Sequence, residues 1–184
     1  MKNQDPPREN LQPIVSLFNN GKLKQALSES NQILEKFPNS VFLFNISGAS
    51  NAGLMQYDAA INSYKKALKI MPNYAEAYFN MGIALKNKGD LEAAIDSYKM
   101  ALKIKPDYVD VFYNMGNTLK EKGDLEASIT SFKMTLKIKP DHTDAYYNMG
   151  IAQNEKGDLE AAIASFKMTL KIKSVKIYLE VKMA

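Results

Sequence analysis

The sequence predicts an all-α fold, a solenoid of stacked antiparallel helix hairpins. The first observation is a fixed period, since Pro38, Pro72, Pro106 and Pro140 are each 34 residues apart. The second is self-similarity, because residues 75–108 and 109–142 are identical at 21 of 34 positions. The third is that each period holds two stretches of apolar residues at helical spacing, separated by a turn. A period of this length is typical of repeat proteins whose units stack in a line.

Residues 75–108 show how one unit forms a hairpin. The first helix is indicated by apolar spacing at Tyr78, Met81, Gly82 and Leu85, and the second by Leu91, Ala94, Ile95, Tyr98, Ala101 and Leu102. Gly89 and Asp90 stand between them. We expect Gly89 to adopt the left-handed conformation that ends a helix, and Asp90 to cap the next helix. Gly82 and Ala94 are small, as needed where two helices cross closely, and we expect Tyr78 and Tyr98 to fill the space between neighbouring hairpins.

The junctions between hairpins carry proline and a second set of capping candidates. Pro106 ends the second helix. Asn73 with Glu76, and Asp107 with Asp110, have the three-residue spacing of a capping box, so we expect Asn73 and Asp107 to cap the helices that follow.

The units follow one another along a single domain. Residues 1–6 are a polar lead that we expect to be disordered. Residues 7–40 form a degenerate capping repeat, in which Pro13 predicts a helix that begins near it or bends there. The second repeat, 41–74, has polar Ser47 and Asn51 at core positions and Met55 in place of the turn glycine. The close copies are 75–108, 109–142 and 143–174.

The tail, residues 175–184, belongs to no repeat. Ser174 replaces the proline, and Ile177 and Val181 continue the stripe from Leu170, which favours a helical extension over the last hairpin. Alternation of apolar residues from Val175 to Val181 also fits a strand, which could pair with another chain. Self-association through the C-terminal end is therefore one expectation.

Composition excludes several classes of protein. The chain has no cysteine, its first ten residues lack the apolar core of a signal peptide, and no apolar run reaches membrane-spanning length, so we expect a cytoplasmic protein. The one histidine, His142, lies in a turn between hairpins, away from any catalytic or metal-binding constellation. No phosphate-binding motif is present. We expect no enzyme activity, no metal and no cofactor.

The net charge of +4 has two interpretations. Lysines gather at the ends of second helices and acids at their starts, which complements the helix dipole and keeps an outer face solvated. The other interpretation is a surface for nucleic acid or an anionic membrane, but arginine, the usual residue for phosphate and base recognition, occurs once in the chain, at Arg8. We favour the first and expect neither a nucleic-acid nor a membrane partner.

The repeats resemble those of the tetratricopeptide repeat (TPR) family. The family pattern of aromatic, large apolar-glycine, large apolar, alanine, aromatic, alanine and proline is matched by Tyr78, Met81-Gly82, Leu85, Ala94, Tyr98, Ala101 and Pro106. The resemblance implies a right-handed TPR superhelix whose first helices line a concave groove. Such a groove binds protein segments.

The groove positions can be read from the repeat register. Each close copy has an asparagine two residues after its core aromatic: Asn80, Asn114 and Asn148. An aromatic precedes each one: Phe79, Tyr113 and Tyr147. Further along come Ile83, Asn117 and Ile151, then Lys86, Lys120 and Asn154. A row of carboxamides can bond the backbone of an extended peptide, and aromatics add contact area. The alternative is that each asparagine only bonds a neighbouring helix.

Two branches of the family help to interpret these positions. The asparagines match the ladder of O-GlcNAc transferase repeats, although Ile46 occupies the ladder position of the second unit and Asn45 lies one residue early. The co-chaperone branch holds a carboxylate with basic residues, and the matching positions here carry Phe79, Tyr113 and Asn148. We therefore expect a non-catalytic scaffold for an extended peptide segment of a partner. The alternative is the substrate-recognition portion of a larger or truncated transferase or oxygenase.

Overall fold

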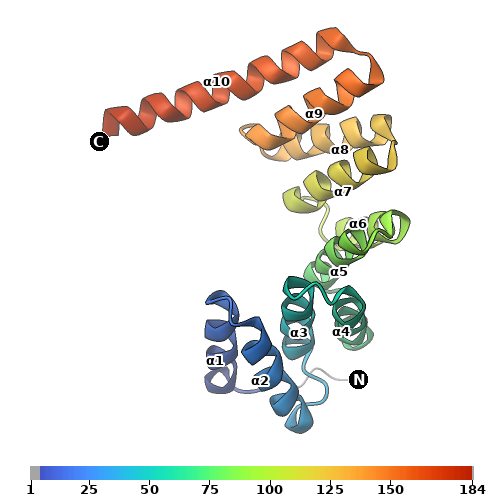
Figure 1. Ribbon diagram of the computed structural model, residues 1–184, viewed down its shortest axis with the longest axis vertical. Helices are drawn as coiled ribbons and strands as arrows, with labels where there is room; N and C mark the ends of the chain where they lie inside the picture. The colour runs from blue at the N-terminus through green and yellow to red at the C-terminus, as the bar shows by residue number, and fades with distance from the viewer. Residues whose placement is uncertain (1–4, 184) are drawn as a thin grey trace. The chain divides into compact units, whose positions relative to one another are not determined.

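The computed structural model describes residues 5–183, and all regular secondary structure in this range is α-helical. The chain divides into two compact units, one ending at Pro106 and one beginning at Asp107 (Figure 1). The first contains α1 (Arg8–Asn19), α2 (Leu23–Lys36), α3 (Val41–Gly53), α4 (Tyr57–Ile70), α5 (Ala75–Lys88) and α6 (Leu91–Ile104). The second contains α7 (Val109–Lys122), α8 (Leu125–Ile138), α9 (Thr143–Lys156) and α10 (Leu159–Met183).

Each unit is a stack of antiparallel hairpins, which confirms the all-α solenoid that the sequence predicts. Within the first unit every helix packs against the next one along the chain, and α3 also contacts α1 and α5. Within the second unit α7 to α10 pack in the same order, and α7 also contacts α9. The sequence predicts one array of repeats over residues 7–174, and in the structure the hairpins of these repeats form two compact units.

The turns inside the close-copy hairpins form as the Gly-Asp pairs predict. Gly89, Gly123 and Gly157 have φ angles of 94°, 90° and 91°, in the left-handed region that glycine tolerates. The aspartate that follows each glycine accepts a hydrogen bond from a backbone N–H three residues later, at 3.2 Å in each case. One helix is thereby ended and the next is capped within two residues.

A close helix crossing holds each hairpin together. A Cβ atom built on Gly82 would lie 2.4 Å from Cε1 of Tyr98, so the tyrosine ring occupies the space that a side chain would need. Tyr98 and Ala94 are both fully buried. The Tyr98 ring thus packs against the paired helix of its own hairpin. At the equivalent position of the next repeat, the Phe132 ring covers Gly116 in its own hairpin and also packs with Ala145 and Met149 of the following one.

The caps at the junctions differ from the sequence prediction by one residue. The N-caps of α5 and α7 are Tyr74 and Tyr108, which make no side-chain capping bond. His142 caps α9, and its Nδ1 accepts a hydrogen bond from the Ala145 N–H at 3.2 Å. Asn73 and Asp107 lie one residue too early to cap, because the backbone reaches its non-helical N-cap conformation at the following residue.

A residue of the lead bonds the start of the second hairpin. Asp5, which falls in the segment 1–6 expected to be disordered, accepts hydrogen bonds from the Ser40 hydroxyl at 2.5 Å and the Phe42 N–H at 3.0 Å. Residues 1–4 lie outside the described residues. α1 begins at Arg8 and contains Pro13 in its interior, so the helix starts earlier than the proline suggests.

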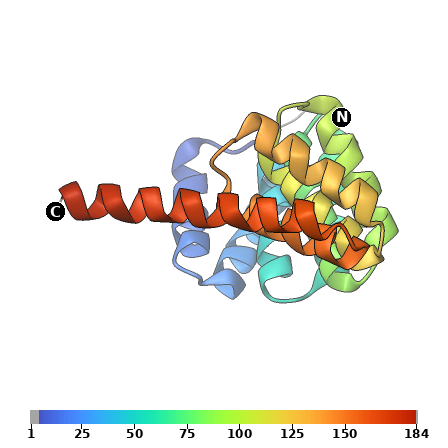
Figure 2. The same ribbon diagram turned by 90° about the horizontal axis from the view of Figure 1, so that it is seen from above.

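The last helix is the longest. α10 runs without a break from Leu159 to Met183, so residues 175–183 extend the helix and do not form a strand. Figures 1 and 2 show α10 continuing well past the end of its neighbour α9. Ala184 lies outside the described residues.

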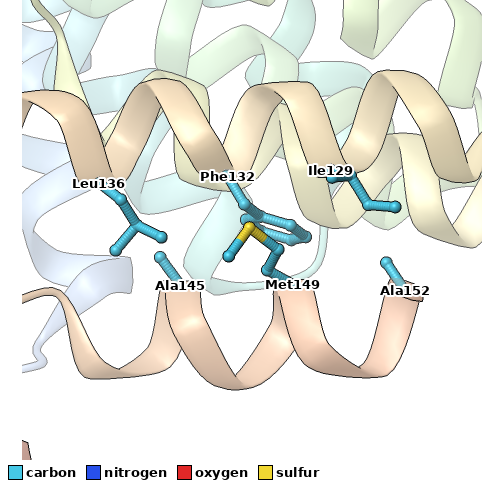
Figure 3. Packing of buried hydrophobic residues seen from close by; sticks show 6 residues of the cluster. All are labelled: Ile129, Phe132, Leu136, Ala145, Met149 and Ala152. Atoms are coloured by element: carbon cyan, nitrogen blue, oxygen red, sulfur yellow. The ribbon is translucent and has the colours of Figure 1, made fainter. Parts of the chain in front are cut away.

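In the second unit, α8, the second helix of its hairpin, is covered by α9, the first helix of the next hairpin. Side chains from α8 face side chains from α9, as Figure 3 shows for Ile129, Phe132, Leu136, Ala145, Met149 and Ala152. All six are buried. The buried side chains of α8 thus lie against an alanine, a methionine and an alanine of α9, the first helix of the next hairpin.

Candidate functional site

The candidate site lies on the first helices of the hairpins, α1, α3 and α5 in one unit and α7 and α9 in the other. In each unit, we call the side on which these helices carry the predicted groove residues the first-helix face of that unit. Contacts of α3 with α1 and α5, and of α7 with α9, place consecutive first helices side by side. Residues at equivalent repeat positions therefore recur along each face.

In the second unit a hydrogen bond joins two of the predicted residues. Nδ2 of Asn148 on α9 donates to the Tyr113 hydroxyl on α7 at 2.9 Å. The Tyr113 ring also lies against His142, with ring centroids 4.8 Å apart, and against Phe132 at 6.0 Å. The bond shows that Tyr113 and Asn148 belong to one face and are held in a fixed relation by neighbouring helices.

The remaining predicted residues of this unit surround that pair. Tyr147 is 51% exposed and its ring packs against Phe166, with centroids 5.8 Å apart. Asn114 is half-buried, and its Nδ2 donates to the Asp110 carbonyl of its own helix at 2.8 Å. Half-buried Asn117, Ile151 and Lys120 and exposed Asn154 complete the set. The face thus combines aromatic surface with carboxamides.

The first unit repeats the same hydrogen-bond geometry. Nδ2 of Asn80 on α5 donates to Oδ1 of Asn45 on α3 at 3.3 Å, and the acceptor lies 35 residues earlier, as it does for Asn148 and Tyr113. Ile46, which occupies the ladder position of α3, is buried. Asn45 therefore reaches the face from the adjacent position and takes part in the row. Half-buried Phe79, Ile83 and Lys86 lie on the same helix as Asn80.

These bonds bear on both interpretations of the asparagines. Asn80 and Asn148 each bond a neighbouring helix, as the structural alternative predicts. Asn114 differs, because its Nδ2 donates to the Asp110 carbonyl of its own helix. A carboxamide has two donor hydrogens and two acceptor lone pairs, so one bond leaves capacity for a ligand. Asn114, bonded to its own helix, separates the two interpretations most cleanly.

A cavity in the first unit extends the candidate site beyond the predicted residues. It has a volume of about 590 Å³ and lies between α1 and α3, lined by Arg8, Leu11, Gln12, Val15, Ser16, Asn19, Asn20 and Phe42. In the repeat register, Leu11, Gln12 and Val15 stand two periods before Phe79, Asn80 and Ile83. Sequence analysis missed these residues because the first repeat lacks the family pattern. Counting the register back from Asn80 would have found them.

The chemistry of the face is that of contact and hydrogen bonding. Groups with a shifted pKa lie elsewhere: burial raises the pKa of Tyr64 on α4, and a hydrogen bond to Asp58 raises the pKa of Lys88 at the end of α5. Across residues 5–183 no group of three His, Asp or Glu side chains is placed to bind a metal. No described helix has the length and apolar character needed to cross a membrane.

Comparison with protein families gives matches along most of the repeat region. A model described as TPR repeat matches residues 56–89, 84–123 and 116–157. A second, described as tetratricopeptide repeat, matches residues 143–174. The matched segments begin at the second helix of the second hairpin, α4, and continue through the third, fourth and fifth repeats to residue 174.

A plant protein also matches part of the chain. A probable UDP-N-acetylglucosamine–peptide N-acetylglucosaminyltransferase SEC of Arabidopsis thaliana is 39% identical over 74 residues, which are 40% of this chain and 8% of the relative. The chain thus matches a small part of that protein.

Solved structures resemble the chain over most of its length. A crystal structure of MamA has a TM-score of 0.84 and 27% identity, covering 89% of this chain and 95% of MamA. YrrB, described as a TPR protein with an unusual peptide-binding site, has a TM-score of 0.76 over 97% of this chain and 93% of its own. Its 19% identity shows a shared fold.

Proposed function

Because the chain belongs to the tetratricopeptide repeat family, we propose that it is a non-catalytic scaffold that binds an extended segment of a partner protein on its first-helix face. The observation that carries the proposal is the Asn148–Tyr113 hydrogen bond between α9 and α7. It presents a carboxamide and an aromatic ring on one face, beside the half-exposed Tyr147.

The physical basis is a match between the face and a peptide backbone. An extended chain offers N–H and C=O groups at regular intervals, and a carboxamide can donate to one and accept from the other. Rings such as Tyr147 supply apolar contact area at low cost in side-chain entropy. Recognition of this kind depends more on backbone than on sequence, so we expect a partner segment free of secondary structure.

The test uses a peptide selected from a random displayed library on the intact protein. Asn114→Ala removes a carboxamide that donates a hydrogen bond to a carbonyl of its own helix. Loss of one or two bonds to the peptide, worth about 0.5–1.5 kcal/mol each, should weaken binding at least 2-fold. We expect an unchanged melting temperature. Isothermal titration calorimetry and thermal unfolding measure the two effects.

The triple change of Asn80, Asn114 and Asn148 to alanine should weaken binding by one to three decades, taking about 0.5–1.5 kcal/mol per site. Unlike Asn114→Ala, it also removes two bonds between helices, so a small loss of stability is expected. The matched control replaces exposed lysines of second helices, Lys103, Lys137 and Lys171, with alanine. If the lysine variant fails to bind while the asparagine variant binds normally, the outer face is the working surface and the proposal is wrong.

A second candidate function is favoured by the match to the plant transferase. Its 39% identity over 74 residues supports a chain that serves as the substrate-recognition portion of a larger enzyme. Under this second candidate function the same face binds the peptide, but the repeats are joined to a catalytic domain. Sequencing the gene beyond the codon for Ala184 tests it, since a transferase or oxygenase reading frame is expected there under this candidate alone.

A further inference from the structure

An apolar stripe on α10 is exposed although its counterpart on α8 is buried. The segments Leu125–Ile138 and Leu159–Ile172 are identical at 12 of 14 positions. Yet Ile129 and Leu136 are 6% and 9% exposed, whereas the equivalent Ile163 and Leu170 are 54% and 68% exposed. Leu159 is 59% exposed as well. We call Leu159, Ile163 and Leu170 the α10 stripe.

The covered copy shows that this stripe is a packing surface. On α8 the equivalent residues lie against Ala145, Met149 and Ala152 of α9 (Figure 3). The stripe on α10 is a different side of the helix from the one that meets α9, where Ala162, Ser165 and Thr169 are buried. Three large aliphatic side chains in line on one helix form an unpartnered surface of the kind that mediates association.

The spacing of the stripe has the symmetry of a helix that pairs with its own copy. In the sequence, apolar residues stand seven positions on either side of Leu170, at Ile163 and Ile177, and eleven positions on either side, at Leu159 and Val181. Two antiparallel copies related by a two-fold axis at Leu170 would align these positions pairwise. Because such an interface is isologous, this self-complementary pattern is what it requires.

Packing of α1 from a second copy onto the stripe is disfavoured by its residues. The α1 positions equivalent to Ala145, Met149 and Ala152 are Glu9, Pro13 and Ser16, all exposed. A charged residue, a proline and a serine cannot reproduce the apolar covering of Figure 3. The length also favours α10, since a 25-residue partner helix can follow the whole apolar pattern whereas a first helix of 14 residues cannot.

We propose that α10 is a homodimerisation surface, on which the α10 stripe pairs antiparallel with the same stripe of a second copy around Leu170. The exposed Lys167 and Lys171 lie near Leu170 in sequence and would approach their counterparts at the rim. Since salt screens like charges, the dimer should strengthen as ionic strength rises. An interface driven by opposite charges would weaken instead.

The first test is mass measurement of the full chain. Analytical ultracentrifugation should show a concentration-dependent dimer for the natural protein and a monomer for Leu170→Glu, because pairing would bury two carboxylates against each other. Ala164→Glu adds the same charge at another exposed position of α10 and should leave the dimer intact. Circular dichroism checks that both variants stay folded. A natural protein that is monomeric at all accessible concentrations overturns the proposal.

The second test determines whether the two copies of α10 pair antiparallel. Because the sequence has no cysteine, each introduced cysteine is the only one in the chain. Leu170→Cys should form a disulfide-linked dimer on mild oxidation, because residue 170 meets its own counterpart at the two-fold axis. Leu159→Cys should not, since antiparallel pairing separates the two residues 159 by about 33 Å at 1.5 Å per residue. Equal cross-linking at both positions, or cross-linking at 159 alone, overturns the antiparallel arrangement.

Discussion

The second and third hairpins, α3–α4 and α5–α6, keep the same helix crossing with different turns and cores. Gly48 is covered by the ring of Tyr64 as Gly82 is by Tyr98. The turn of the second hairpin, however, places Met55 at φ 59° where the third has Gly89 at φ 94°. The fold therefore depends on the glycine–aromatic crossing more than on the turn residue.

The cores of the two hairpins also differ, because α3 has polar residues at two buried positions where α5 has apolar ones. Ser47 and Ser50 of α3 occupy the positions of Met81 and Ala84 in α5, and both serine hydroxyls are buried without a hydrogen-bond partner. Burying an unpaired hydroxyl costs free energy. The second hairpin therefore keeps its register at a cost in local stability, which three sets of substitutions can measure.

The largest effect is expected at the shared crossing. Gly82→Ala places a methyl group 2.4 Å from the buried ring of Tyr98, and Gly48→Ala places one 2.5 Å from that of Tyr64. Overpacking of this kind destabilises by about 1–3 kcal/mol. Both variants should lower the midpoint of urea unfolding by similar amounts. A large loss at one glycine and none at the other would break the comparison.

The turns should respond in opposite directions. Met55→Gly removes a side chain from a left-handed residue and should stabilise the protein by about 1–2 kcal/mol, whereas Gly89→Met should destabilise it by a similar amount. Met55 is 75% exposed, so little packing is lost. Thermal unfolding of the two single variants and of the double variant measures both effects. Destabilisation by Met55→Gly would show that its side chain has another role.

The smallest effect is expected in the core of α3. Ser50→Ala gives α3 the residue that α5 has at the equivalent position and removes an unpaired buried hydroxyl. We expect stabilisation of about 1 kcal/mol, measured by urea unfolding. Ser30→Ala is the control, because the Ser30 hydroxyl donates to the Ala26 carbonyl at 2.7 Å and its loss should bring no comparable gain. Equal gains from both variants would contradict the role given to the unpaired hydroxyl.

Much of the fold could be predicted because its determinants are local. Glycine followed by aspartate fixes a turn and a cap within two residues, so Gly89 and Asp90 could be assigned from sequence. The junction caps were misplaced because the box spacing at Asn73 does not show where the backbone leaves the helical region. The division at Pro106 could not be predicted, since the repeat register continues through it.

The positions of the candidate site residues could be predicted from the sequence, but their hydrogen-bond partners could not. Register alone placed Asn80, Asn114 and Asn148 on first helices. The bonds of Asn80 and Asn148 depend on the residue 35 positions earlier, Asn45 or Tyr113, whereas Asn114 bonds its own helix. All three bonds also depend on side-chain rotamers that periodicity does not specify. The cavity beside Leu11 and Val15 was missed because the first repeat departs from the pattern.

The central claim, that the first-helix face binds an extended peptide, is tested most directly by site-specific photo-cross-linking. Benzoylphenylalanine replaces Tyr147, a conservative change at a half-exposed aromatic of the face, and in a second variant replaces the exposed Lys137 of α8. Each variant is irradiated with the library-selected peptide and the products are mapped by mass spectrometry. We expect covalent peptide at position 147 and none at position 137. Cross-linking at 137 with none at 147 would contradict it.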